Sequence, residues 1–134
     1  MEDNERSTVV LRYRDGHALR CTLLEEFQPS DRVVVAETED GETINVDVDA
    51  LKAVFFLKDP LRREYEIQTG HVTIPPAGGA PSRVEFTDGE VIHGRMASYR
   101  VDDNGFFLYP ASLDSNNERI FVVARALRTL SIEG

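Results

Sequence analysis

The chain has 134 residues, and 24 Asp and Glu side chains against 15 Lys and Arg give a formal net charge of −9. At 41% hydrophobic and 29% charged residues, the composition is that of a globular protein. The acidity disfavours nonspecific binding to nucleic acid and anionic membranes, because both require a positive surface. No apolar run is long enough to span a membrane, and the single Cys21 excludes a disulfide framework. We therefore expect a cytoplasmic protein that does not insert into membranes.

The first half of the chain has the pattern of short strands. Its first segment alternates apolar and polar side chains, as a half-buried strand does, and Asp15-Gly16 follows it. An Asp-Gly pair readily takes the positive φ angles of a tight hairpin turn. Together with a second turn at Asp40-Gly41 and one helical turn at 49–51, this pattern predicts five strands, at 8–14, 18–24, 32–37, 43–48 and 53–57.

The second half of the chain repeats this pattern. Leu11 matches Val84, and the offset of 73 also aligns Val33 and Val35 with Phe106 and Leu108. Nearer the C-terminus the offset becomes 76, which places three extra residues between Leu108 and Ile120. A duplicated fold is the simplest cause. The repeat predicts five more strands, at 83–87, 91–99, 105–109, 119–123 and 127–132.

Five short strands with a one-turn connection before the last describe a small, strongly bent barrel. The chain is thus expected to be all-β, with one barrel at 8–59 and a second at 82–134, packed together. Residues 60–81 are expected to be a linker, because their second part is rich in proline and glycine.

The strand pattern with its Asp-Gly turn resembles the Sm-like small barrel, whose wiring SH3-like barrels share. Three longer motifs, LKAVFFLKD at 51–59, GFFLYPA at 105–111 and SNNERIF at 115–121, resemble those of an uncharacterised bacterial family. That family is a domain of unknown function, sometimes found beside signalling domains such as the cyclic-di-GMP-binding PilZ type. The resemblance implies a bacterial protein related to signalling and no established activity.

Resemblance to Sm-like proteins also raises RNA binding. Those proteins hold RNA with the loop after their second strand and with an Arg-Gly or Lys-containing turn before the last strand. The matching turns here, 49–52 and 125–128, lack the Gly-Asn pair of that family, and Asp102-Asp103 would place acidic groups near the phosphates. RNA binding by a degenerate Sm-like fold is therefore the weakest of the functions considered.

A ligand-binding loop is predicted where the second half carries its extra residues. The loop offers one arginine with amides and hydroxyls that could grip a phosphate or a carboxylate. We assign to it Arg119, Asn116, Asn117 and Ser115, with Tyr109 as an aromatic neighbour. The competing interpretation is that the asparagines only form a turn through side-chain to backbone hydrogen bonds.

Paired phenylalanines predict an aromatic docking surface. Because neighbouring strand residues point to opposite faces, one member of each of the pairs 55–56 and 106–107 should leave its own barrel. Phe55 and Phe107 are the candidates for contact with a partner. The alternative is that these rings are buried between the two halves.

Catalysis and metal binding have no positive signal in the sequence. The acidic pairs Glu37/Glu39 and Asp47/Asp49 lack the spacing of a calcium loop, and the three histidines lack that of metal ligands. No phosphate loop, dinucleotide fingerprint or nucleophile elbow is present, so no cofactor and no enzyme activity are expected.

These observations favour a noncatalytic interaction or regulatory module of bacterial signalling that docks a protein partner. The alternative is a receptor for an anionic small ligand such as a cyclic nucleotide, centred on Arg119. Homo-oligomerisation is compatible with both functions.

Overall fold

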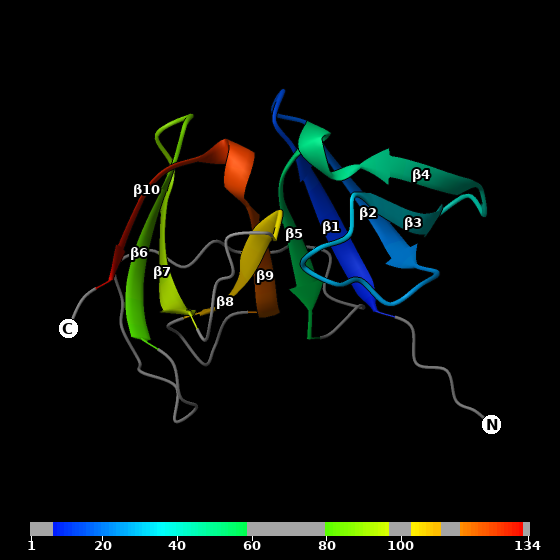
Figure 1. Cartoon of the computed structure of the whole chain (residues 1–134). Coiled ribbons are helices and arrows are strands. Elements are labelled where there is room, and N and C mark those ends of the chain that lie inside the picture. Colours follow the sequence, from blue (N-terminus) through cyan, green and yellow to red (C-terminus); the bar gives the residue numbers. More distant parts are fainter. Residues whose placement is uncertain (1–6, 59–79, 97–102, 111–115, 133–134) are drawn as a thin grey trace.

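The computed structural model describes residues 7–58, 80–96, 103–110 and 116–132, and it is all-β (Figure 1). Ten strands occupy the places that the repeat predicts, within a few residues at each end. They are β1 (Thr8–Tyr13), β2 (Ala18–Leu23), β3 (Val33–Thr38), β4 (Thr43–Asp47), β5 (Leu51–Leu57), β6 (Ala80–Phe86), β7 (Val91–Met96), β8 (Gly105–Pro110), β9 (Asn117–Val123) and β10 (Leu127–Ile132). One-turn 3₁₀ helices, η1 (Val48–Ala50) and η2 (Ala124–Ala126), precede β5 and β10. Most of the predicted linker lies outside the described residues.

All ten strands belong to one antiparallel sheet with the order β10-β6-β7-β8-β9-β5-β1-β2-β3-β4. The first half (β1–β5) and the second half (β6–β10) have the same internal wiring, because the last strand of each pairs with its first strand. The halves meet edge to edge where β5 pairs with β9, so the described strands form a continuous open sheet. Its two ends are β4 and β10, which lie on opposite sides of Figure 1.

β5 joins the two halves, because its side chains belong to the cores of both. Every one of its residues is buried. Val54 and Phe56 pack into the core of the first half, which also takes in Phe121 from β9. Ala53 and Phe55 point the other way and pack into the core of the second half. A strand that is apolar on both faces must be covered on both, and here each half supplies one of the two covers.

The structure corrects the alignment of the third strands. Val34, not Val33, lies opposite Val46 as Phe106 lies opposite Val122, so the offset of the repeat is 72 at this point. Val33 is 47% exposed, whereas Val34 and Phe106 are buried. A slip of one residue exchanges the two faces of a strand, and the neighbouring run of three valines hides such a slip in the sequence. Since the offset then rises to 76, four extra residues lie between the third and fourth strands of the second half, and one residue fewer precedes its third strand, which leaves the net excess at three.

The Asp-Gly turns have the predicted positive φ angle at the glycine but not at the aspartate, since no described residue other than glycine has a positive φ. Gly16 has a φ angle of 106°, and the backbone N–H of Tyr13 donates to the carbonyl of His17 across the turn. Within the described residues, no helix is long and apolar enough to cross a membrane.

Candidate functional site

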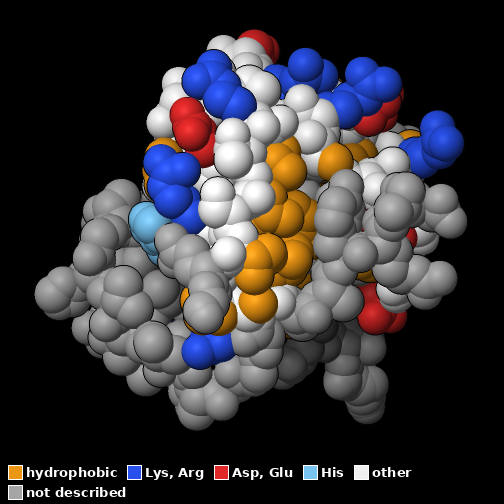
Figure 2. Space-filling model, turned by 60° about the vertical axis from the view of Figure 1, so that its left-hand side comes forward, with side chains coloured by type: hydrophobic (Ala, Val, Ile, Leu, Met, Phe, Trp, Pro, Cys, Tyr) orange, Lys and Arg blue, Asp and Glu red, His pale blue; other side chains and the backbone are white. Residues whose placement is uncertain are grey.

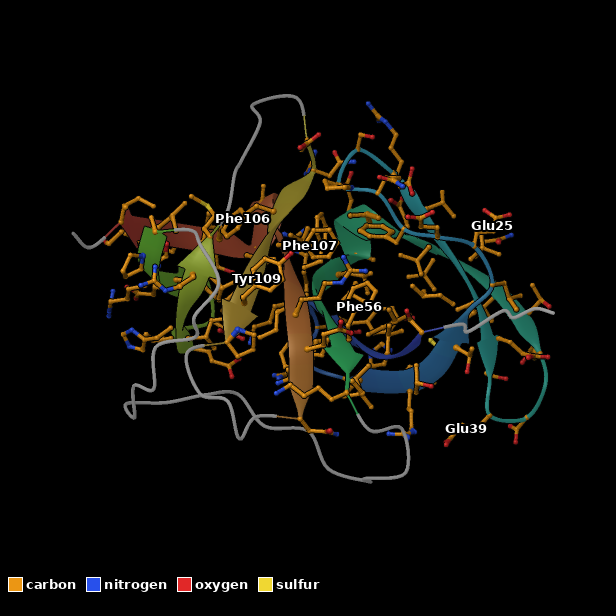
Figure 3. The ribbon with its side chains drawn as sticks, turned by 90° about the horizontal axis from the view of Figure 1, so that it is seen from below. Glu25, Glu39, Phe56, Phe106, Phe107 and Tyr109 are labelled. Carbon is orange, nitrogen blue, oxygen red and sulfur yellow. The ribbon has the colours of Figure 1, made fainter. Side chains whose placement is uncertain are left out.

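Arg119 lies against two aromatic rings that touch each other. The guanidinium carbon is 4.4 Å from the ring centroid of Phe56 on β5 and 4.4 Å from that of Phe107 on β8. The two rings are themselves in contact edge to face, with their centroids 5.8 Å apart (Figure 3). A guanidinium over an aromatic face gains cation–π attraction. Its N–H groups lie in the plane of the guanidinium itself and can still donate to other acceptors. Arg119 is thus a positioned cation.

A hollow of about 250 Å³ lies beside Arg119. Phe56 and Arg119 form one part of its wall, and the loop that follows β2 supplies Glu25, Glu26 and Phe27. The two carboxylates are exposed, whereas Phe27 is buried and packs edge to face on Phe121. The lining of the hollow therefore includes a cation (Arg119), aromatic rings (Phe27 and Phe56) and two carboxylates (Glu25 and Glu26). This lining suits a group that carries both signs of charge.

The predicted loop asparagines do not line this hollow. Asn116 and Asn117 are each 1% exposed. Asn117 opens β9 and lies opposite Leu57, and the carbonyl of Asn116 accepts a hydrogen bond of 2.7 Å from the backbone N–H of Lys58. Both residues therefore fix the start of β9 against the end of β5. Ser115 lies outside the described residues.

Tyr109 follows Leu108, whose partner on β9 is Ile120, the residue after Arg119. It sits on β8 opposite Arg95 of β7, half-buried, and it does not line the hollow. Of the predicted ligand-binding residues that the structure describes, only Arg119 lines this hollow, and Phe107 of the predicted partner-binding pair contacts Arg119 without lining the hollow.

The two phenylalanines predicted for an aromatic docking surface differ in exposure. Phe55 is 1% exposed and packs among residues of the second half, whereas Phe107 is partly buried and packs against the core of the first half. Each leaves its own half, as the alternation along a strand predicts. Docking of a partner at these rings stays a prediction.

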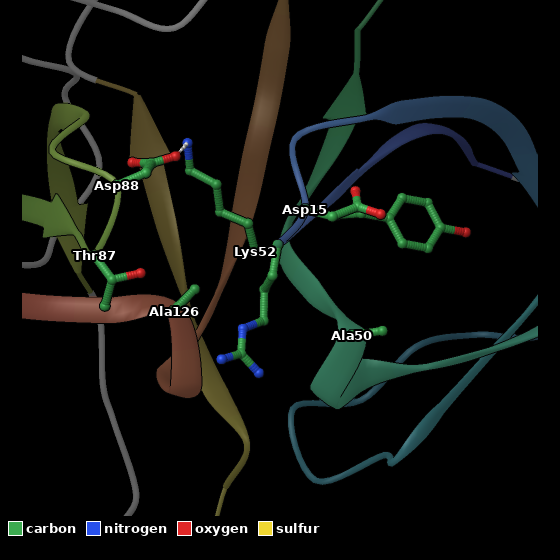
Figure 4. A pocket seen from close by; sticks show the side chains of 8 residues that line it. Asp15, Ala50, Lys52, Thr87, Asp88 and Ala126 are labelled. Carbon is green, nitrogen blue, oxygen red and sulfur yellow. Dashed lines mark hydrogen bonds and ion pairs between the residues drawn. The ribbon is translucent and has the colours of Figure 1, made fainter.

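A second cluster, around Lys52, was not predicted. Lys52 on β5 is 4% exposed, and its Nζ donates to Asp88 Oδ2 at 2.8 Å (Figure 4). It also donates to Glu90, which lies in the same turn between β6 and β7 as Asp88. Arg12 Nη2 lies 3.5 Å from Glu90 Oε1. The sequence signal was a single lysine inside the apolar run of β5, since a buried lysine requires a partner.

The Lys52 cluster borders a hollow of about 430 Å³ between the hairpin turns of the two halves. Partial burial acts to raise the pKa of Asp88, but the hydrogen bonds from Lys52 and from the backbone N–H of Glu90 outweigh it and lower the pKa. Lysine and carboxylates neutralise one another here, so the cluster joins the halves and leaves no net charge for an anion.

A third ionic contact joins the two 3₁₀ turns. Arg125 Nε lies 3.2 Å from Asp49 Oδ1, and both side chains are solvent-exposed. These two residues occupy equivalent positions of the repeat, 76 apart. An exposed pair of this kind contributes little stability, yet it shows that the facing turns have opposite charge.

Among the described residues, no group of three or more His, Cys, Asp and Glu side chains is arranged to hold a metal ion. Cys21 is buried, and burial raises the pKa of its thiol to about 11, so it remains protonated at neutral pH. His17 is exposed at its turn, with Nδ1 2.6 Å from Asp15 Oδ1.

Comparison with known proteins gives one match. Residues 5–134 match a family described as a family of unknown function (DUF6982). No curated protein and no solved structure matches the chain at a significant level. Since the match covers nearly the whole sequence, the chain belongs to the DUF6982 family.

Proposed function

We propose that the protein is a noncatalytic interaction module of bacterial signalling that docks a partner protein at the Arg119 hollow. The observation that carries the proposal is the placement of the Arg119 guanidinium against Phe56 and Phe107, at the wall of a cavity that aromatic rings also line. Among the described residues, Arg119 forms no ion pair.

The chemistry of the hollow selects the kind of partner. A carboxylate can accept two parallel hydrogen bonds from the edge of a guanidinium that the rings already hold in place. Glu25 and Glu26 on the opposite rim would repel a bare anion and attract a lysine or arginine. We therefore expect a peptide segment with an acidic and a basic residue on either side of an apolar one.

Binding of a purified partner to Arg119 variants tests the proposal. A partner is first captured and identified by crosslinking to the full chain, and its affinity is then measured for the wild type, Arg119→Lys, Arg119→Ala and Arg32→Ala. Arg32 is exposed and lines a different hollow, so it is the matched control. We expect Arg119→Ala to lose about 10-fold or more in affinity, Arg119→Lys to lose less, and the control to bind as the wild type does. Equal binding by a folded Arg119→Ala variant would contradict the proposal.

The second candidate is a receptor for an anionic small ligand such as a cyclic nucleotide. The same contact favours it, because an arginine beside an aromatic face can bind a phosphate and stack a base. A rise in melting temperature with cyclic dinucleotides, lost in Arg119→Ala, would support it. RNA binding would instead show an affinity that falls steeply with salt.

For the architecture, we propose that each half is an Sm-like (SH3-like) five-stranded small barrel. The support is the pairing of the last strand with the first in both halves and the 3₁₀ turn before each last strand. A cytoplasmic location is likewise proposed, and the single buried Cys21 suits a reducing compartment.

A further inference from the structure

The junction between the halves can be repeated between molecules. Within the chain, the last strand of the first half, β5, pairs with the fourth strand of the second half, β9. The equivalent strands of the opposite halves are β10 and β4, and these are the two ends of the sheet formed by the described strands. Pairing of β10 of one chain with β4 of another would therefore be equivalent to the pairing of β5 with β9 within one chain.

The repeat also fixes the register of such a contact. Val54 lies opposite Phe121 in the inner junction. The offset of 76 converts this pair into Leu130 of one chain opposite Asn45 of the next. Strand edges with unpaired backbone groups are templates for antiparallel addition of this kind.

The charges agree with this arrangement at the Lys52 cluster. The pair Lys52–Asp88 of the inner junction becomes Arg128 of one chain facing Asp15 of the next. Both side chains are more than half exposed, at 56% and 68%. The positive member is retained on the last strand and the negative member on the hairpin turn.

A second ionic contact becomes a carboxylate facing an imidazole. Arg12 and Glu90 of the inner junction become Glu85 of one chain and His17 of the next. An imidazole N–H can donate a hydrogen bond to a carboxylate, so this pair remains attractive.

The third contact reproduces itself. Asp49 and Arg125 are equivalent to one another, so the translated pair is Arg125 of one chain with Asp49 of the next. Of the four ionic contacts that the described residues make across the inner junction, three thus translate into attractive pairs, whereas the fourth, Lys52–Glu90, becomes Arg128 of one chain beside His17 of the next, which are not opposite charges. We propose that copies of this chain associate head to tail, with β10 of one copy pairing with β4 of the next. This inference is independent of the Arg119 hollow.

The net charge of the two halves does not by itself favour this association. Residues 1–70 contain 16 acidic and 9 basic side chains, whereas residues 71–134 contain 8 and 6, so both halves are net negative. The attraction must therefore come from the individual side-chain pairs and from the strand pairing. Figure 2, which brings the β10 side of the molecule forward, shows Lys and Arg together with Asp and Glu side chains around an apolar strip.

The association is expected to be weaker than the inner junction. Thr129 and Ser131 of β10 stand where Ala53 and Phe55 stand on β5, so less apolar surface is buried. Because the contact joins two different surfaces, it continues from copy to copy until a ring closes. Concentration-dependent assembly beyond a dimer is the expected behaviour.

Sedimentation velocity of the full chain tests the proposal, at concentrations from about 1 μM to about 1 mM, the range that suits a weak contact. We compare the wild type with Arg128→Glu, Asp15→Arg and the double variant. Each single variant should weaken association by about 10-fold or more, and the double variant should recover most of it, because the pair is restored with reversed signs. Glu118→Lys, a charge change at an exposed residue of β9 outside the translated pairs, is the control.

Circular dichroism and melting confirm that each variant folds. Growth of the wild type with concentration, loss in both single variants and recovery in the double variant together support the proposal. A wild type that remains monomeric throughout would overturn it, as would folded single variants that assemble like the wild type or a double variant that does not recover.

Discussion

Lys52 on β5 donates a hydrogen bond of 2.8 Å to Asp88 in the turn between β6 and β7, and this contact crosses the boundary between the two halves. Because Lys52 is almost fully buried, its charge depends on the carboxylates of the other half. The junction therefore has a polar component at one end of an otherwise apolar strand pair.

Replacement of Lys52 should separate the cost of losing a charge partner from that of losing packing. Lys52→Ala is expected to lower the free energy of unfolding by about 3 kcal/mol, because it leaves a cavity beside two close carboxylates. Lys52→Met retains most of the volume and should cost about 1 kcal/mol or less. Urea denaturation measures both values. Equal losses in the two variants would show that the ion pair, not the packing, supplies the stability.

Stability should fall in acid partly through Asp88. Its folded pKa lies below the ordinary value of 3.8, so the folded state favours the ionised form. This contribution is present above pH of about 4 and is lost as the pH falls through the lowered pKa. The difference in unfolding free energy between the wild type and Asp88→Asn should therefore shrink from pH 7 toward pH of about 3. A difference that stays constant over this range would contradict the assignment.

Loss of the Phe55 ring should destabilise both halves together. Phe55 belongs to a strand of the first half but packs in the core of the second, so Phe55→Ala should cost about 3–5 kcal/mol. Amide hydrogen exchange should then rise in β6–β10 as well as in β1–β5, since the two cores share β5. Faster exchange confined to the first half would show that the halves unfold independently.

Gly105 should not tolerate a side chain. A Cβ atom at this position would lie 2.0 Å from the carbonyl oxygen of Val122, which is backbone and cannot move aside. Gly105→Ala is expected to cost about 3 kcal/mol or to prevent folding. Val33, its equivalent on β3, is half exposed, and Val33→Ala should change the melting temperature little. Thermal melting of the two variants makes the comparison.

The thiol of Cys21 should be protected in the folded protein. Burial raises its pKa to about 11, so little thiolate forms at pH of about 8 and access is blocked. Labelling by a thiol reagent should be slow in buffer and fast in denaturant. Rapid labelling of the native protein would show that β2 opens readily.

The strands and turns were predictable because they depend on local signals. Alternation of apolar residues marks which positions face a core, and Asp15-Gly16 marks a tight turn. The one error of register fell at Val33–Val35, where three similar residues in succession carry no alternation. Only pairing with β4 distinguishes the buried valine from its neighbours.

The candidate site was predictable only in part. Arg119 was identified by its charge in a polar loop, but its contact with Phe56 joins residues far apart in the sequence. The neighbouring Asn116 and Asn117 have the composition of an exposed loop and are buried all the same. Their burial follows from the pairing of β9 with β5, which no local pattern encodes.

By itself, the sequence determined the ten strands, their turns and the repeat, because these follow from side-chain periodicity and backbone preference over a few residues. It also showed that β5 is apolar on both faces, and hence that both must be covered. Only the tertiary structure decided what covers them. Pairing of β5 with β9 sends Phe55 into one core and Phe56 into the other, and it leaves β4 and β10 at the ends of the sheet. The local sequence pattern indicates that a residue will be buried. Which residue it packs against depends on contacts between distant segments, and these form only when the chain folds.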